Sequence, residues 1–281
     1  MSLLLDNMTR RLVAGGISSP RLEARLILGT ACGINADEAA ILQRPLNEDE
    51  QKKLETMMLQ RLGHKPLDKI IGLKGFYKYE FLVSEAVLSP RPDTEIIVEE
   101  ALKLLDSGIT QNIADFGTGS GCILLSLLAE NKLWQGQGVD RSADALQIAA
   151  ANARALKLEK RVSWFNCSWF DANLPQLLRV PLDLLVSNPP YIPAADIASL
   201  EPEVRNYDPP AALDGGEDGF EHYRQIAALA PKLLKKGGFV VLEAGYGQAE
   251  EISRLFAAQG LQPVKIVPDL AGIDRCVILK K

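Results

Sequence analysis

The residues with the greatest chemical potential stand together in Asn188-Pro189-Pro190-Tyr191, at the end of a hydrophobic run over Leu182–Ser187. The two prolines have φ fixed at about −65°, carry no N–H and favour an extended residue before them, so the local carbonyls are not consumed by a helix. The Asn188 side chain offers a further acceptor, and the Tyr191 ring can lie against a planar or cationic group. This arrangement suits a planar –NH2 group held through both of its hydrogens. The alternative is a simple turn, since Asn and Pro are common turn residues.

A second motif predicts a nucleoside cofactor. Ile113-Ala114-Asp115 reaches a loop, Gly117-Thr118-Gly119-Ser120-Gly121, that opens a helix over 122–129. Glycines allow the backbone to approach a ligand closely, and the first turn of a helix offers free N–H groups. Asp140 ends the next expected strand, about twenty residues further on, where a carboxylate can accept both hydroxyls of a ribose.

The spacing of this loop bears on which nucleoside binds. It is G-x-G-x-G, with Cys122 where the last glycine of the dinucleotide motif G-x-G-x-x-G would fall. Asp115 just before the loop suits a cofactor with a cationic amino acid tail rather than a pyrophosphate. S-adenosylmethionine carries that tail. The alternative is a glycine-rich strand-helix turn that binds no ligand.

The first part of the chain is expected to be helical. Helices are predicted over 3–14, over 20–31 behind Ser19-Pro20, and from the cap at Asn47 to about residue 62. Residues 75–83 predict a β-hairpin with Lys78 near its turn. We therefore expect a helical substrate-docking domain over 1–68, a hairpin linker over 69–90 and a catalytic domain over 91–281.

Beyond Pro90-Arg91-Pro92 the chain alternates helix and strand, which predicts a doubly wound, mostly parallel seven-stranded sheet covered on both faces. A helix is expected over 94–105, and the seven strands over 112–115, 136–140, 162–166, 182–187, 238–243, 263–268 and 275–279. In a strand order of 3-2-1-4-5 the first and fourth strands flank the switch point, where ligands bind. The glycine loop and Asn188 would then face one crevice.

Composition narrows the class of protein. The 281 residues are 47% hydrophobic with a net charge of −5, which argues against a broad grip on nucleic acid. No apolar run is long enough to span a membrane and the start lacks the basic flank of a signal peptide, so we expect a cytoplasmic protein. Four scattered cysteines and two histidines, His64 and His222, give no metal-ligand spacing and no basis for a Ser/His/Asp site.

Taken together, these motifs resemble the HemK/PrmC family, the protein-(glutamine-N5) methyltransferases that modify peptide chain release factors. The resemblance rests on Ser-Pro-Arg-Leu-Glu-Ala at 19–24, Val-Leu-Ser-Pro-Arg-Pro-Asp-Thr-Glu at 87–95, the glycine motif at 115–121, Ser-Asn-Pro-Pro-Tyr at 187–191, and Asp208-Pro209 through 215–219. Asn-Pro-Pro-Tyr alone also occurs in enzymes that methylate adenine amino groups. Pro-Arg-Pro-Asp-Thr-Glu at this distance upstream is the more specific signal.

The resemblance implies methyl transfer from S-adenosylmethionine to the side-chain amide of the glutamine in the Gly-Gly-Gln motif of class I release factors. It implies a class I methyltransferase fold and assigns cofactor contacts to Gly117, Thr118, Gly119, Ser120, Gly121, Asp140, Trp169 and Asn188. It assigns the glutamine to Asn188, Pro189, Pro190 and Tyr191, with catalysis at Asn188, Pro189 and Tyr191. One departure is Ser168, where the family usually has the Asp that meets the adenine amino group.

Two alternative substrates use the same chemistry. They are a glutamine of a ribosomal protein and, less favoured by the acidic balance, the adenine N6 of nucleic acid. A non-catalytic adaptor is a third possibility, which is disfavoured because the motif positions needed for the chemistry are all occupied by suitable residues. Segment 90–95 is expected to serve both as an interdomain joint and as a wall of the cofactor site. We expect a monomer that uses no metal, contacts no membrane and does not bind nucleic acid directly.

Overall fold

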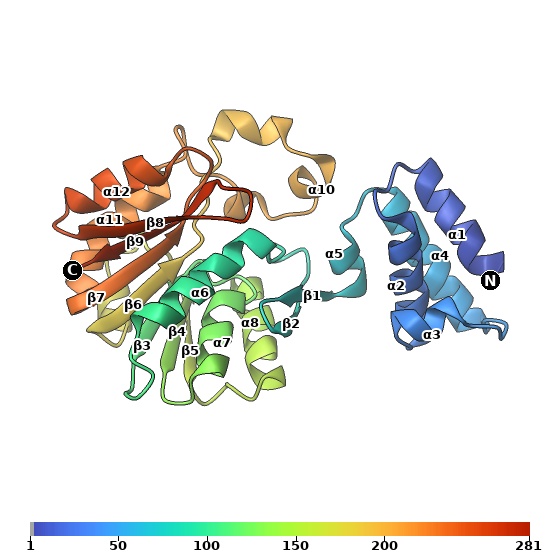
Figure 1. Cartoon of the computed structure of the whole chain (residues 1–281), viewed down its shortest axis with the longest axis horizontal. Coiled ribbons are helices and arrows are strands. Elements are labelled where there is room, and N and C mark those ends of the chain that lie inside the picture. The colour runs from blue at the N-terminus through green and yellow to red at the C-terminus, as the bar shows by residue number, and fades with distance from the viewer. Residues whose placement is uncertain (1–2) are drawn as a thin grey trace. The chain divides into compact units, whose positions relative to one another are not determined.

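The computed structural model describes residues 3–281 and divides the chain into two compact units (Figure 1). One unit comprises the chain up to Leu73 together with Pro202–Tyr207, and the other comprises Lys74–Glu201 together with Asp208–Lys281. Six residues from the later part of the sequence thus belong to the helical unit. The sequence analysis assigned no element to this polar segment and did not predict that it belongs to the helical unit.

The helical unit is a small bundle around one apolar core. Its helices are α1 (Leu3–Ala14), α2 (Pro20–Cys32), α3 (Ala36–Ala40), α4 (Glu48–Leu62), α5 (Leu67–Ile71) and the short α10 (Pro202–Arg205). The expected helix starts are confirmed: Pro20 occupies the first turn of α2, and Asn47 caps α4 in a capping box with Glu50. Leu5, Met8, Leu28 and Met58 are almost fully buried in the core.

A buried ion-pair cluster holds segment 202–207 against this bundle. The Arg61 guanidinium lies 2.5 Å from Glu23 and 2.8 Å from Glu203, and Arg61 is only 4% exposed. The Tyr207 hydroxyl donates to the Gly63 carbonyl at 2.8 Å. A buried guanidinium needs such partners, because an unpaired buried charge is costly.

The predicted hairpin is confirmed. It comprises β1 (Leu73–Phe76) and β2 (Tyr79–Leu82), with Lys78 in its turn. Phe76 and Phe81 meet edge to face at 6.1 Å and are buried against the helices of the catalytic unit.

The catalytic unit is built on the expected seven-stranded sheet. The strands are β3 (Asn112–Phe116), β4 (Gln135–Asp140), β5 (Val162–Asn166), β6 (Leu182–Ser187), β7 (Leu234–Glu243), β8 (Gln262–Pro268) and β9 (Asp274–Lys280). Their order is β5-β4-β3-β6-β7-β9-β8, and β9 runs antiparallel to the other six strands. Counted from β3, the first five strands have the predicted order 3-2-1-4-5. The switch point lies between β3 and β6.

Helices cover both faces of this sheet (Figure 1). On one face pack α6 (Glu95–Leu104), α7 (Cys122–Glu130) and α8 (Ala143–Ala155), with Ile97, Leu124 and Ala153 in the core. On the other face pack α9 (Leu174–Leu177), α11 (Glu221–Leu233) and α12 (Ala249–Ala257). Three short 3-10 helices, η1 (Pro92–Thr94), η2 (Ala194–Ser199) and η3 (Pro210–Ala212), lie in the connections. Within residues 3–281, no helix is both long enough and apolar enough to cross a membrane.

Candidate active site

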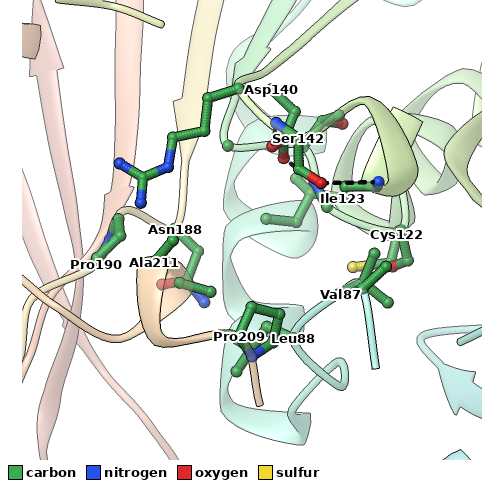
Figure 2. A pocket seen from close by; sticks show the side chains of 18 of the residues that line it. Val87, Leu88, Cys122, Ile123, Asp140, Ser142, Asn188, Pro190, Pro209 and Ala211 are labelled. Carbon is green, nitrogen blue, oxygen red and sulfur yellow. Dashed lines mark hydrogen bonds between the residues drawn. The ribbon is translucent and has the colours of Figure 1, made fainter. Parts of the chain in front are cut away.

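A cavity lies at the carboxyl ends of β3, β4 and β6, where a doubly wound sheet places its ligands. Figure 2 shows its lining, with Asp140 and Ser142 at one end of the view and Leu88 and Pro209 at the other. Eight predicted site residues line it: Gly117, Thr118, Gly119, Ser120, Asp140, Trp169, Asn188 and Pro190. The structure therefore brings the glycine loop and the Asn-Pro-Pro segment to one cavity, as the strand order predicted.

The glycine loop owes its shape to three residues in the left-handed region. Gly117, Gly119 and Gly121 have φ of 73°, 54° and 80°, which L side chains rarely adopt. The Gly117 and Thr118 N–H groups donate to the Val139 carbonyl at 2.9 and 3.1 Å, which holds the loop on β4. Gly121 precedes α7 as its N-cap and is not among the lining residues.

Asp115 lies under this loop rather than on the cavity wall. Its side chain is fully buried and accepts the Thr118 hydroxyl at 2.7 Å, and burial raises its pKa to about 7. The residue is not among those that line the cavity. Asp115 thus fixes the loop through Thr118, and its contact with a cationic tail stays a prediction.

Asp140 presents a carboxylate at the end of β4. Its two oxygens accept the N–H groups of Gly119 and Ser142, each at 2.9 Å. Burial raises the pKa of Asp140, and these two donors oppose that effect. A carboxylate oxygen has two lone pairs, so each oxygen retains an acceptor site for a ribose hydroxyl.

Trp169 is buried and forms an apolar wall. Its ring stacks on Phe116 with centroids 6.1 Å apart and 3° between the planes. Its Nε1 donates to His222 Nδ1 at 3.2 Å, and His222 Nε2 then donates to the Asp214 carbonyl at 3.0 Å. This pattern requires neutral His222, whose pKa burial lowers. The sequence assigned no role to His222, which is 7% exposed and lines the cavity.

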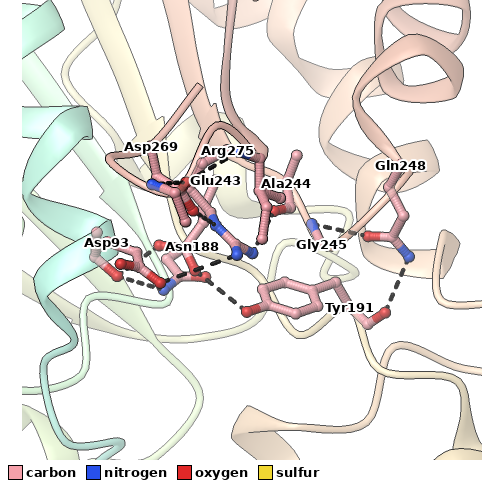
Figure 3. A network of polar contacts seen from close by, with 12 residues as sticks. Asp93, Asn188, Tyr191, Glu243, Ala244, Gly245, Gln248, Asp269 and Arg275 are labelled. Atoms are coloured by element: carbon pink, nitrogen blue, oxygen red, sulfur yellow. Dashed lines mark hydrogen bonds and ion pairs between the residues drawn. The ribbon is translucent and has the colours of Figure 1, made fainter. Parts of the chain in front are cut away.

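Asn188 stands half-buried at the other side of the glycine loop. Its Nδ2 donates to Thr94 Oγ1 at 3.3 Å, and Thr94 in turn donates to Glu243 at 2.5 Å. Figure 3 shows this network with Tyr191, whose hydroxyl donates to the other Glu243 oxygen at 3.3 Å. Pro189 and Tyr191 are not among the lining residues. Burial and the nearby Glu243 raise the pKa of Tyr191, so this phenol is no base at neutral pH.

The segment before α6 contributes a wall, as expected. Ser89, Pro90, Arg91 and Thr94 all line the cavity, and Arg91 lies 3.7 Å from Asp208. Ser168 also lines the cavity, where its hydroxyl accepts the Phe170 N–H at 3.2 Å. Val87 and Leu88 line the cavity too, whereas the sequence assigned the wall only to residues 90–95.

The cavity matches a nucleoside cofactor in shape and chemistry. It offers an acceptor for a diol at Asp140, a flat apolar wall at Trp169 and an open backbone at Gly119, next to which an added Cβ would meet only one atom, at 4.0 Å. Two lining serines, Ser89 and Ser120, have buried hydroxyls without a hydrogen-bond partner among the described residues. Such orphaned groups are costly unless a ligand or water pairs with them. The fold and this site define an S-adenosylmethionine-dependent methyltransferase.

Comparisons with known proteins identify the family. Residues 4–72 match the model of the PrmC N-terminal domain, and residues 94–199 match that of the methyltransferase small domain. The release factor glutamine methyltransferase of Rhodospirillum rubrum is 42% identical over 279 residues, which cover 99% of this chain and 84% of that protein. The enzyme of the same name from Caulobacter vibrioides is 41% identical over 271 residues, covering 95% and 92%. The chain therefore belongs to the release factor glutamine methyltransferase family.

A solved structure supports the fold independently. The hMettl16 catalytic domain, in complex with MAT2A 3'UTR hairpin 6, aligns with a TM-score of 0.57 at 16% identity and covers 83% of this chain and 82% of that chain. At this identity the likeness concerns the fold alone.

Proposed function

We propose that this protein transfers a methyl group from S-adenosylmethionine to the side-chain amide nitrogen of the glutamine in the Gly-Gly-Gln motif of class I release factors. The observation that carries the proposal is the Asn188 amide at the cavity, with Nδ2 held by Thr94 and Oδ1 left to accept. Membership of the release factor glutamine methyltransferase family supports the choice of substrate.

The chemical difficulty is the substrate nitrogen. Its lone pair is shared with the carbonyl, the same resonance that gives the peptide bond a rotational barrier of about 18–20 kcal/mol. Asn188 Oδ1 and the Pro189 carbonyl would each accept one N–H of the glutamine amide, which fixes the nitrogen and favours electron density on it. Tyr191 would close the far side of the amide.

The cofactor would be held by the residues already described. Asp140 would accept the ribose hydroxyls, Trp169 would pack beside the adenine, and the loop from Gly117 to Gly121 would cradle the methionine end. S-adenosylmethionine supplies an electrophilic methyl group when bound. Positioning is then the main contribution of the protein, because well-oriented partners reach effective molarities of about 10⁵ M and above. On transfer the sulfonium would leave as the neutral thioether S-adenosylhomocysteine, and the amide nitrogen would lose one proton to solvent. The two acceptor dipoles would face the nitrogen as it becomes positive, and an N-protonated amide is acidic enough to lose its proton without a metal or a strong base.

The finer assignments follow from this function. We place the enzyme in the cytoplasm, as a monomer, and assign substrate docking to the helical domain. The domain limits proposed from the sequence, 1–68, 69–90 and 91–281, remain our proposal, with the addition that 202–207 packs on the helical unit.

The test is to locate the transferred methyl group. The protein is incubated with isotope-labelled S-adenosylmethionine and, separately, with purified release factor, ribosomes or DNA, and the label is mapped by mass spectrometry. We expect one methyl on the Gly-Gly-Gln glutamine, and none on a release factor in which Asn replaces that glutamine. Label on a ribosomal protein or on adenine would overturn the proposed substrate.

A further inference from the structure

The side-chain amide of Asn188 can be oriented in two ways, with either Oδ1 or Nδ2 toward the substrate. The oxygen and nitrogen of an Asn amide have nearly the same size, so the side chain can present either an acceptor or a donor from the same position. Only the acceptor can take an N–H from a substrate amide. If the group turned by 180°, Nδ2 would face the substrate, and donor would oppose donor.

Thr94 supplies a partner that settles this direction. Its hydroxyl has one hydrogen, and that hydrogen is donated to Glu243 at 2.5 Å. The Thr94 oxygen can then only accept, and the atom it faces at 3.3 Å is Asn188 Nδ2. Thr94 is 3% exposed, so water has little access to replace either contact.

Glu243 is what makes Thr94 an acceptor. It ends β7 with an exposed fraction of only 2%, and both of its carboxylate oxygens receive hydroxyls, from Thr94 and from Tyr191. The Tyr223 hydroxyl donates to the Glu243 backbone carbonyl at 2.8 Å, which fixes the end of β7. Arg275 lies beside it, held by Asp269 at 3.3 Å and by the Ala244 carbonyl at 3.1 Å (Figure 3). Burial raises the pKa of Glu243, while the Thr94 hydroxyl and the Arg275 guanidinium lower it. Because both carboxylate oxygens receive hydroxyl donors, the geometry is that of the ionised form, which has only acceptors.

From this chain of contacts we propose that Glu243 and Thr94 are positioning residues that set the direction of the Asn188 amide and so keep Oδ1 toward the substrate. The inference rests on the proposed role of Asn188 as the acceptor for an amide –NH2. Hydrogen bonds run one way, from Asn188 to Thr94 to Glu243. A neutral group in place of the carboxylate could donate to Thr94, reverse both bonds and turn the amide.

Three variants test this inference. Thr94→Val keeps the shape but removes the hydroxyl, Thr94→Ser keeps the hydroxyl, and Glu243→Gln replaces the carboxylate with an amide that can donate. Glu100→Gln is the matched control, since Glu100 is a buried acid of the same unit, 6% exposed, that pairs with Lys103 on α6. Turnover is measured at saturating cofactor and substrate, cofactor affinity by calorimetry, and folding by thermal unfolding.

We expect Thr94→Val and Glu243→Gln to lower kcat by about ten- to a hundredfold, the cost of a misplaced reacting group, while cofactor Kd changes by less than about threefold. Thr94→Ser should recover most of the turnover, and Glu100→Gln should match the wild type. A merely structural role would give a Thr94→Ser variant as slow as Thr94→Val, or a loss that follows the melting temperature. Either result, or unchanged kcat in Thr94→Val, would overturn the inference.

The same assay separates this inference from the proposed function. If the wild type methylates ribosomal protein or adenine instead of release factor, the proposed substrate is wrong, and the variants are compared on the substrate found. The inference then stands or falls on that series. If the wild type methylates none of these substrates, both proposals fail.

Discussion

Asp140→Ala removes the carboxylate that we propose accepts the ribose hydroxyls, so it should weaken cofactor binding. The carboxylate ends β4, accepts two loop N–H groups at 2.9 Å and lines the cavity. Its remaining lone pairs would accept the two ribose hydroxyls. Hydrogen bonds to a charged group contribute about 1.5–3 kcal/mol each, and part of this is offset by water in the variant. A net loss of about 3 kcal/mol corresponds to a cofactor Kd raised by about a hundredfold.

Isothermal titration calorimetry with S-adenosylhomocysteine, the demethylated cofactor, measures this loss without turnover. Asp140→Asn keeps the shape and one acceptor, so we expect an intermediate increase in Kd, of about tenfold. Asp144→Ala is the control, because Asp144 is an exposed acid in the first turn of the next helix. Unchanged affinity in Asp140→Ala, or an equal loss in Asp144→Ala, would refute the ribose assignment.

The pH dependence of the same titration gives a second check. Burial raises the pKa of Asp140 above 3.8, and only the ionised form leaves both oxygens free to accept. Affinity should therefore be full at neutral pH and fall as the pH drops toward this raised value. Asp140→Asn should lose that dependence.

Three further predictions concern the loop, a buried histidine and the helical unit. Gly119→Ala should raise cofactor Kd by about tenfold or more, and its positive φ should cost about 1–2 kcal/mol of stability. Gly247 also has a positive φ and open space around it, so Gly247→Ala should cost a similar stability but leave cofactor Kd unchanged. Because burial lowers the pKa of His222 from 6.5, the free energy of unfolding should fall as pH drops below 6.5; thermal unfolding between about pH 7.5 and 5.5 should show a smaller fall in His222→Gln. Arg61→Met leaves Glu23 buried without its main partner and should destabilise the helical unit by about 3 kcal/mol, measured by urea unfolding; a loss below about 1 kcal/mol would contradict the ion-pair argument.

The sequence was most informative where a functional motif is formed by residues that are adjacent in the chain. The loop from Gly117 to Gly121 needs a positive φ at three positions, and only glycine adopts this readily. The loop can therefore be recognised from five consecutive residues. Asn188 likewise follows a hydrophobic strand and precedes two prolines. The alternation of helix and strand then sufficed to predict the strand order and to place both motifs at one switch point.

What the sequence could not give are contacts that depend on packing between distant residues. Thr94 and Glu243 are 149 positions apart, and the residues around each of them do not predict their contact. His222 has no motif around it in the sequence, but the fold buries it against Trp169, which lies 53 positions away. The hydrogen bond from Thr118 to Asp115 likewise depends on how the glycine loop folds back over β3, which the sequence alone did not show.

The role of Asn188 is tested most directly in single-turnover experiments on the Asn188→Ala variant, with saturating S-adenosylmethionine and release factor. Asn188 Oδ1 is proposed to hold the reacting amide, so the methyl-transfer rate should fall by about a hundredfold or more while cofactor Kd stays within about threefold of the wild type. A variant that binds the cofactor normally and transfers the methyl group at the wild-type rate would show that Asn188 does not hold the substrate amide.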